Sequence, residues 1–432
     1  MQISVDFTKP QAAIKPMHGV GQPPFQGINF DMFKYLKDAS IPYSRLHDVG
    51  GAYGGFRWVD IPNIFRNFED DEYSEESYDF AFTDLLIKAL IENGVEPFFR
   101  LGVTIENYAK IKAYRIYPPK DPKKWAVICE HIIRHYTEGW ANGFFYDIKY
   151  WEIWNEPDNF EEIEENCMWR GTKEEYYELY TVASKHLKSC FPHLKIGGYA
   201  SCGFYALSGN FIKEAASSPR YSYFITFLDG FLDHIKKEGA PIDFFSWHSY
   251  DNIKNNIVYA EYARARLTEA GFPECEILCN EWNTEMSKRG TARHAAVLMG
   301  MLIAFQRTEM TSAMFYDAGL SIGVFGSLFN PLTKEPFPAY YAFYAFGELY
   351  RLGCEVQSTV TESDGVYALA ARNDERGCIV IANTEENDIP LSLDINGKIT
   401  KCITTDSDGY MKEDKIPKIL PKNSITVIYT DI

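Results

Sequence analysis

The chain has 432 residues, of which 46% are hydrophobic, 16% aromatic and 24% charged, and its formal net charge is −17. This composition is typical of a globular protein, and the length suits a large domain of about 250 or more residues plus a smaller one. The negative charge argues against nucleic acid or an anionic membrane as the main partner, because both require a basic surface.

The N-terminal segment and the cysteines favour a reducing compartment. The first twenty residues lack the charged start, apolar core and small-residue cleavage site of a secretion signal, and no apolar run is long enough to span a membrane. Nine cysteines, an odd number, are scattered without a metal-ligand spacing. The sequence therefore predicts a cytoplasmic protein with thiols rather than disulfides, and it leaves a homo-oligomer open.

Residues 16–345 alternate short apolar runs with longer segments of helical period, the order expected of βα units around a parallel sheet. Three intervening helices are predicted at 80–94, 123–139 and 174–192, where apolar residues recur every three or four positions. Eight strands are enough to close a (β/α)8 barrel. These strands are predicted near 18–20 and from Tyr43, Glu96, Lys149, Lys195, Asp243, Glu276 and Ser312.

After about residue 350, alternating apolar and polar runs are separated by turn residues, including Asn396-Gly397 and Asp408-Gly409, which indicates an antiparallel β module. The opening strand QISVDF has the same alternation. The predicted fold is thus α/β, a (β/α)8 TIM barrel with a C-terminal antiparallel β-sandwich. Its predicted parts are an N-terminal strand in 1–15 that joins the β module, a catalytic barrel over 16–345 and the accessory β-sandwich over 346–432.

Two of the predicted barrel strands end in Asn-Glu, at Asn155-Glu156 and Asn280-Glu281. Reacting groups of such barrels lie at the carboxyl ends of the strands, and carboxylates are rarely buried without a reason. Each Glu taken alone could cap a helix or pair with an arginine. Together they provide the two carboxyl groups that hydrolysis of a glycosidic bond needs, about 5 Å apart for a retaining mechanism or roughly 6.5 to 9.5 Å apart for an inverting one.

The segments around these residues resemble glycosidases of clan A, and most closely glycoside hydrolase family 39, the group of β-xylosidases and α-L-iduronidases. YWEIWNEPD at 150–158 resembles the acid/base segment of that family, and EILCNEWNT at 276–284 resembles its nucleophile segment. The resemblance spans nearly the whole chain. It implies that Glu156 is the general acid/base, that Glu281 is the nucleophile and that Asn155 binds the sugar 2-hydroxyl.

Two further motifs extend the resemblance. Arg45-Leu46-His47 is similar to the Arg-x-His of the second strand, which implies that Arg45 supports the nucleophile and that His47 contacts the glycone. Trp247-His248-Ser249-Tyr250 is similar to the His-x-Tyr of the sixth strand, which implies a substrate-binding role for His248 and a hydrogen bond from Tyr250 to the nucleophile. The alternatives are that Arg45 is a core ion-pair partner and that each histidine is a hydrogen-bonded packing residue.

The chain departs from the family pattern at two positions beside the expected glycone. Asp48 stands where the second-strand motif usually continues with Gly, and Tyr316 stands near the place of a Trp on the eighth strand. Among the tryptophans, Trp282 is the one expected to stack on sugar. A raised pKa is expected for Glu156, from apolar surroundings and the charge of Glu281, whereas Arg45 and Tyr250 should keep Glu281 ionised.

These observations predict a retaining exo-glycosidase that acts on short oligosaccharides or small glycosides, needs no cofactor or metal, and has β-xylosidase activity as the first choice. The alternatives within the family are β-glucosidase, β-galactosidase, α-L-arabinofuranosidase and α-L-iduronidase. Outside it are a noncatalytic sugar-binding barrel and a metal- or phosphate-dependent barrel enzyme. The last would need a metal-ligand cluster or a glycine-rich phosphate loop, to which only the loosely glycine-rich stretch 319–326 corresponds.

Overall fold

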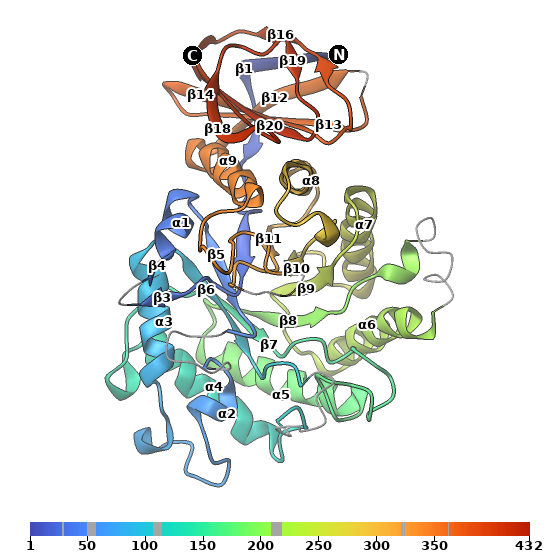
Figure 1. Ribbon diagram of the computed structural model, residues 1–432. Helices are drawn as coiled ribbons and strands as arrows, with labels where there is room; N and C mark the ends of the chain where they lie inside the picture. The colour runs from blue at the N-terminus through green and yellow to red at the C-terminus, as the bar shows by residue number, and fades with distance from the viewer. Residues whose placement is uncertain are drawn as a thin grey trace.

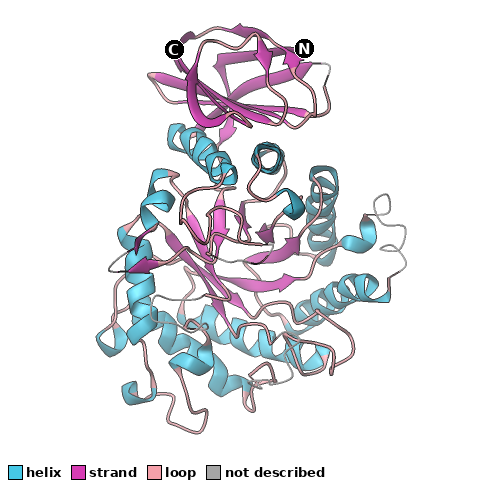
Figure 2. Ribbon diagram, in the orientation of Figure 1, coloured by secondary structure: helices cyan, strands magenta, loops and turns pink. Residues whose placement is uncertain are grey.

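The computed structural model describes residues 1–27, 30–49, 58–106, 115–208, 218–320, 323, 325–361 and 363–432. A closed barrel and a separate sheet dominate this part of the chain (Figures 1 and 2). In order around the barrel its strands are β10 (Glu276–Trp282), β11 (Ser312–Phe315), β2 (Gly19–Gly21), β5 (Tyr43–Leu46), β6 (Glu96–Leu101), β7 (Tyr150–Ile153), β8 (Lys195–Ser201) and β9 (Phe244–Ser249).

All neighbouring strands of the barrel run parallel, and each predicted strand is present, so the predicted barrel is confirmed. Helices lie outside the strands, as Figure 2 shows. They are α1 (Phe33–Asp38), α2 (Ile61–Ile64), α3 (Ala81–Glu92), α4 (Pro122–Thr137), α5 (Lys173–Cys190), α6 (Pro219–Glu238), α7 (Ile253–Ala270), α8 (Ala292–Gln306) and α9 (Pro338–Leu352). Short 3-10 helices are η1 (Glu75–Ser77), η2 (Trp140–Asn142), η3 (Tyr205–Leu207) and η4 (Met286–Lys288).

The three helices predicted from periodicity correspond to α3, α4 and α5, and local capping explains where two of them begin. The Asp121 carboxylate accepts hydrogen bonds from the first backbone N–H groups of α4, whose first residue is a proline. Thr172 and Glu175 form a reciprocal capping box at the start of α5. These contacts satisfy N–H groups that have no partner inside the helix.

The second sheet is largely antiparallel and forms the accessory module. In spatial order its strands are β16 (Ser392–Ile395), β1 (Gln2–Ala13), β12 (Cys354–Thr361), β13 (Val366–Arg372), β14 (Arg376–Asn383), β20 (Ser424–Asp431), β17 (Lys398–Asp406) and β18 (Gly409–Asp414). Two-stranded pairs are β15 (Ile389–Pro390) with β19 (Ile419–Leu420) and β3 (Gln26–Gly27) with β4 (Phe30–Asp31). The predicted C-terminal β module is therefore confirmed.

The N-terminal strand lies in this second sheet, where β1 pairs antiparallel with β12 and parallel with β16. Helix α9 runs through residues 345 and 346, the predicted domain boundary, and β12 starts two residues after the helix ends. The division into domains at those residues stays a prediction.

The accessory sheet has two buried faces. Along β13 and β14, Leu369 and Val380 belong to the core shared with α8 and α9, whereas Ala370 and Ile379 belong to a core inside the module. This alternation follows from the two-residue period of a strand. Figure 1 shows the sheet lying over α8 and α9, the helices that follow β10 and β11, so the module supports the side of the barrel that carries Glu281.

Candidate active site

A cavity of about 690 Å³ is lined by both predicted catalytic carboxylates, Glu156 and Glu281. Many of its lining residues lie at or just beyond the carboxyl ends of the barrel strands, where active sites of this architecture lie, and α6 contributes Arg220, Tyr221 and Phe224. Glu156 follows β7, in a left-handed backbone conformation with a φ of 44°, and Glu281 lies in β10. One carboxylate oxygen of each residue lies within 4.8 Å of an oxygen of the other.

Glu281 is held by the two residues expected to support it. Arg45 Nη1 lies 3.2 Å from Glu281 Oε2, and the Tyr250 hydroxyl donates a hydrogen bond of 2.5 Å to Oε1. Burial nevertheless raises the pKa of Glu281, and the negative charge of Glu156 adds to the effect. Arg45 and Tyr250 oppose this rise, as expected of groups that favour the ionised form, but desolvation outweighs them.

The pKa of Glu156 moves opposite to the expected direction. Burial raises it, but a 2.6 Å hydrogen bond with Nδ1 of His248 and the charge of that imidazole overcome burial, so the pKa is lowered. Asn159 Nδ2 donates a second hydrogen bond of 2.9 Å to the other oxygen of Glu156. The prediction of a raised pKa is corrected because the sequence does not reveal that His248 adjoins the carboxyl group.

His248 bridges the two carboxylates and does not line the cavity. Its Nε2 lies 3.6 Å from Glu281 Oε2, while its Nδ1 contacts Glu156. Burial lowers the pKa of His248, but the charges of Glu281 and Glu156 outweigh burial and raise it. The expectation that His248 binds substrate directly is corrected, because its ring is enclosed between the two carboxylates and only 1% exposed.

Arg45 is the centre of a buried polar network beneath the cavity. It forms an ion pair of 2.7 Å with Glu152 and donates a 2.5 Å hydrogen bond to Oδ1 of Asn155, besides its contact with Glu281. Arg45 is 1% exposed and does not line the cavity, so it acts behind Glu281 and Asn155 rather than on substrate. Asn155 does line the cavity.

Glu152 is a residue of this network that the sequence analysis missed. It lies in the middle of β7 and is fully buried, and it accepts hydrogen bonds from Ser246 and Asn280 in addition to its ion pair. The only signal was a carboxylate inside an otherwise apolar strand, the same type of signal that pointed to Glu156.

The wall formed by His47, Asp48 and Tyr316 carries a chain of hydrogen bonds. Gln22 Nε2 donates to the Tyr316 hydroxyl at 2.5 Å, and this hydroxyl donates to Asp48 Oδ2 at 3.1 Å. His47 Nε2 lies 3.2 Å from Asp48 Oδ1, while its Nδ1 accepts a hydrogen bond from Arg100. Burial and then the charge of Arg100 hold the pKa of His47 well below its usual value, so this imidazole is neutral and Nε2 carries its proton.

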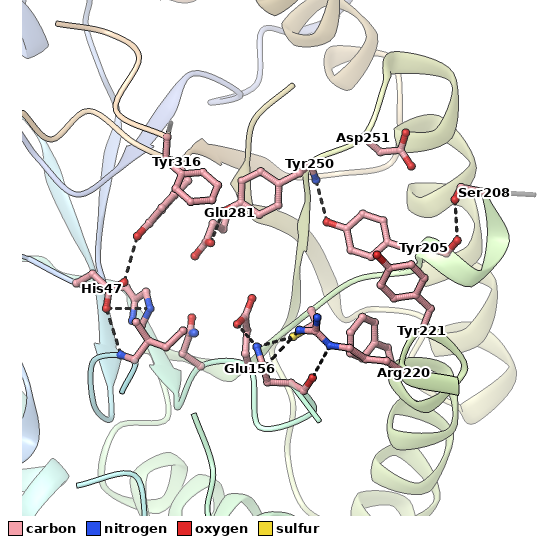
Figure 3. Close-up of a pocket in the computed structure, with 17 residues that line it drawn as sticks. His47, Glu156, Tyr205, Ser208, Arg220, Tyr221, Tyr250, Asp251, Glu281 and Tyr316 are labelled. Atoms are coloured by element: carbon pink, nitrogen blue, oxygen red, sulfur yellow. Dashed lines mark hydrogen bonds and ion pairs between the residues drawn. The ribbon is translucent and has the colours of Figure 1, made fainter. Parts of the chain in front are cut away.

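Aromatic residues and Arg220 form the facing wall, as Figure 3 shows, with Glu156 and Glu281 between the two walls. The Tyr205 and Tyr221 rings have centroids 5.2 Å apart, and the Arg220 guanidinium lies 5.6 Å from the centroid of Phe224. Arg220 Nε also donates to the backbone oxygen of Asn159 at 2.9 Å. This wall could not be predicted from the sequence, because its residues lie on η3 and α6 and belong to no motif.

Trp282 does not reach the cavity, and its predicted stacking on sugar is wrong. The side chain is fully buried and packs against Phe305, Phe315 and Phe343, with ring centroids 5.2, 5.3 and 6.3 Å away. Successive side chains of a strand point to opposite faces. Because Glu281 faces the cavity, the next residue faces the helices outside the barrel.

Two groups of side chains in the described part of the chain have the spacing of metal ligands. One is Glu156, His248 and Glu281, and the other is Glu130, His186 and Cys190. In the first group a short hydrogen bond already joins His248 to Glu156. The glycine-rich stretch 319–326, the candidate phosphate loop, lies partly outside the described residues. No helix of the described part has the length and hydrophobicity of a membrane span.

The chain is similar to proteins of known activity. The chain is 25% identical to a β-xylosidase from Geobacillus stearothermophilus over 359 residues, covering 69% of this chain and 64% of the relative, so it spans less than two thirds of that protein's length. It is 26% identical to a β-xylosidase from Caldicellulosiruptor saccharolyticus over 389 residues, covering 80% of this chain and 71% of the relative.

Solved structures share the fold. A glucosidase from Croceicoccus marinus superposes with a TM-score of 0.78 at 20% identity, and a monomeric β-xylosidase from Caulobacter crescentus with a TM-score of 0.68 at 18% identity; each comparison covers 100% of this chain and 99% of the other. The model of "Glycosyl hydrolases family 39" matches residues 53–297, more than half of the sequence. The chain therefore belongs to glycoside hydrolase family 39.

Proposed function

We propose that this protein is a retaining exo-glycosidase of short oligosaccharides or small glycosides, with β-xylosidase as its first activity. The spacing of the two carboxylates carries the proposal. Their nearest oxygens are within 4.8 Å, which agrees with the approach of about 5 Å typical of retaining enzymes and leaves no room for the water that inversion requires. The names of the two curated relatives support xylose as the glycone.

In the proposed mechanism Glu281 attacks the anomeric carbon while Glu156 donates a proton to the departing oxygen, which gives a glycosyl ester on Glu281. Glu156 then removes a proton from water, and that water displaces Glu281 from the anomeric carbon. Two inversions give net retention. Asn155 uses Oδ1 to accept from Arg45, which leaves its Nδ2 donors for the sugar 2-hydroxyl.

His248 completes the proposed acid/base unit. The 2.6 Å contact between Glu156 and His248 lets the two groups share one proton. Glu156 is the acid when that proton lies on its carboxyl group, with Nδ1 of His248 as the acceptor. After the proton has gone to the leaving group, Glu156 is ionised and ready to act as the base. The cavity of about 690 Å³ suits a small glycoside.

The first test measures hydrolysis of a panel of 4-nitrophenyl glycosides: β-xyloside, β-glucoside, β-galactoside, α-L-arabinofuranoside and α-L-iduronide. NMR should show the first-formed product with the anomeric configuration of the substrate. Inverted product would refute the retaining mechanism, and a complete lack of turnover would favour a noncatalytic sugar-binding barrel. Activity that survives a chelator would argue against a metal-dependent reaction.

The second test separates the roles of the carboxylates. Glu281→Gln should abolish turnover, and a 2-fluoroglycoside should label Glu281 in the wild-type protein. Glu156→Ala should retain rapid glycosylation by substrates with activated leaving groups, and azide should rescue its slow second step. Equal loss on all leaving groups without rescue would refute the acid/base assignment. Glu92→Gln changes a side chain that is 63% exposed on α3 and serves as the matched control.

Four statements of the sequence analysis are not tested by the fold and stay predictions. They are a cytoplasmic location, no need for a cofactor or metal, no nucleic-acid partner, and the possibility of a homo-oligomer.

A further inference from the structure

The two departures from the family pattern contact each other. Asp48 and Tyr316 are 268 positions apart in the sequence, yet the hydroxyl of Tyr316 donates a hydrogen bond of 3.1 Å to Oδ2 of Asp48. They follow β5 and β11, and between these two strands in the barrel lies β2, which is followed by Gln22, the donor to Tyr316. Three consecutive strand ends thus provide one connected set of polar side chains on the cavity wall.

The Asp48 carboxylate lacks enough donors for its charge. Its side chain is only 17% exposed, and its three contacts, with the Tyr316 hydroxyl, the His47 ring and the backbone N–H of Ile105, come from groups that carry no full positive charge. Burial, followed by the charge of Glu281, raises the pKa of Asp48 to about 7. A carboxylate has room for about four hydrogen bonds, so hydroxyl groups of a bound sugar would meet an unfilled acceptor that faces the cavity.

The backbone at Asp48 supports a functional reason for this residue. Its φ is 54°, a left-handed conformation that glycine adopts freely and other residues adopt at a cost. Strain of this kind persists where the surrounding structure or the function requires the side chain. The Asp48 carboxylate both accepts a hydrogen bond of 3.4 Å from the backbone N–H of Ile105 and lines the cavity.

We propose that Asp48, positioned by Tyr316, selects the glycone: its carboxylate accepts hydrogen bonds from hydroxyls of a neutral sugar and repels a sugar that carries its own carboxylate. The inference rests on the proposed glycosidase function and narrows it to neutral glycones, against the α-L-iduronidase alternative. Tyr316 is a positioning residue, because its hydroxyl donates a hydrogen bond to Oδ2 of Asp48 and accepts one from Gln22.

The arrangement of the two cavity walls indicates that Asp48 contacts the glycone, the sugar that is transferred to Glu281, rather than the leaving group. The wall with Asp48 is built from strand ends of the barrel itself and adjoins Glu281, the residue that must meet the anomeric carbon. The facing wall of aromatic rings and Arg220 is built from η3 and α6, outside the ring of strands (Figure 3). Hydrogen-bond acceptors suit recognition of sugar hydroxyls, and flat rings suit stacking on an aglycone.

The test is a substrate-by-variant cycle. kcat/KM is measured above pH 7, where the Asp48 carboxyl group is ionised, for the wild type, Asp48→Asn, Tyr316→Phe and the double variant. The substrates are the best nitrophenyl glycoside of the panel, its monodeoxy analogues and the matching uronoside. Asp48→Asn should lower kcat/KM about 10- to 100-fold on the parent glycoside, the range of a hydrogen bond to a charged group. On the deoxy analogue that lacks the hydroxyl bound by Asp48, the same variant should lose less than about threefold.

Tyr316→Phe should lower kcat/KM by a smaller factor than Asp48→Asn, with the same pattern across the deoxy analogues. The factor lost by the double variant should be smaller than the product of the two single factors. The ratio of uronoside to parent activity should rise in Asp48→Asn. Asp147→Asn, at a side chain 84% exposed, controls for the substitution itself. If Asp48→Asn loses the same factor in kcat/KM on every analogue, or loses nothing, the inference is overturned while the hydrolase assignment stands. If the wild-type protein is inactive on all glycosides, both are refuted.

Discussion

Replacing the Asp48 carboxyl group should stabilise the protein in a pH-dependent way. The pKa of this group rises from 3.8 to about 7 because of burial and then Glu281, with Asp60 adding to the rise and Arg100 and Tyr316 opposing it. Between those values the folded state holds a proton that the unfolded state has lost. Stability therefore falls as pH rises from about 4 to 7, by up to ~4 kcal/mol for a shift of about three units.

Asp48→Asn removes this cost, because an amide does not ionise and asparagine tolerates the left-handed backbone. The gap in unfolding free energy between variant and wild type should be near zero at pH 4 and reach its full size above pH 7. With ~2.1 cal/mol/K per residue for the entropy of unfolding, 432 residues give ~0.9 kcal/mol/K, so the upper limit corresponds to a rise in Tm of about 4 °C.

Differential scanning calorimetry of both proteins from pH 4 to 8 measures this gap. Subtracting the wild-type value from that of the variant at each pH cancels the contributions of the other titrating groups that the two proteins share. The control Asp147→Asn should have the same Tm as the wild type across the range. A gap that is constant with pH, or that shrinks as pH rises, would contradict the assignment of an uncompensated buried charge to Asp48.

Three other substitutions test the network around the carboxylates. Trp282→Ala should destabilise the protein by about 3 to 5 kcal/mol without changing its relative preference among glycosides, as measured by denaturation and by kcat/KM ratios; a selective loss on one sugar would restore a binding role. Arg220→Gln removes a charge that lowers the pKa of Glu156, so the basic limb of the kcat/KM profile should move to higher pH, and a shift to lower pH would contradict this. Glu152→Gln leaves Arg45 without its closest counter-charge and should cost about 3 to 5 kcal/mol in unfolding free energy; a cost below 1 kcal/mol would show that the buried ion pair is dispensable.

The sequence predicted the barrel well because its strands and helices carry their own periodic signals. The eight strands are short apolar runs of β-forming residues, and α4 and α5 also have local capping residues next to them. Glu156 and Glu281 could be predicted because each ends an apolar strand, and this position alone places a side chain at the mouth of a barrel.

Most of the errors came from contacts between distant segments, and one, at Trp282, came from a local pattern. Glu152 lies 107 positions from its partner Arg45, and His248 lies 92 positions from Glu156, so no local pattern reports either contact or its effect on a pKa. Trp282 was misassigned because its neighbour Glu281 faces the cavity, and the strand alternation that turns Trp282 away was not applied there. The aromatic wall carries no motif and becomes visible only when η3 and α6 are brought together.

The position of β1 between β12 and β16 has a consequence for synthesis. The backbone N–H of Phe7 donates to Asn396, 389 residues later, so the first strand leaves the ribosome long before the strands that pair with it exist. During translation the barrel helices and strands can assemble while β1 waits as an apolar, unpaired edge, which is a template for aggregation. A protein cut after α9 would keep that edge permanently exposed, and we expect it to aggregate even though every barrel strand is intact.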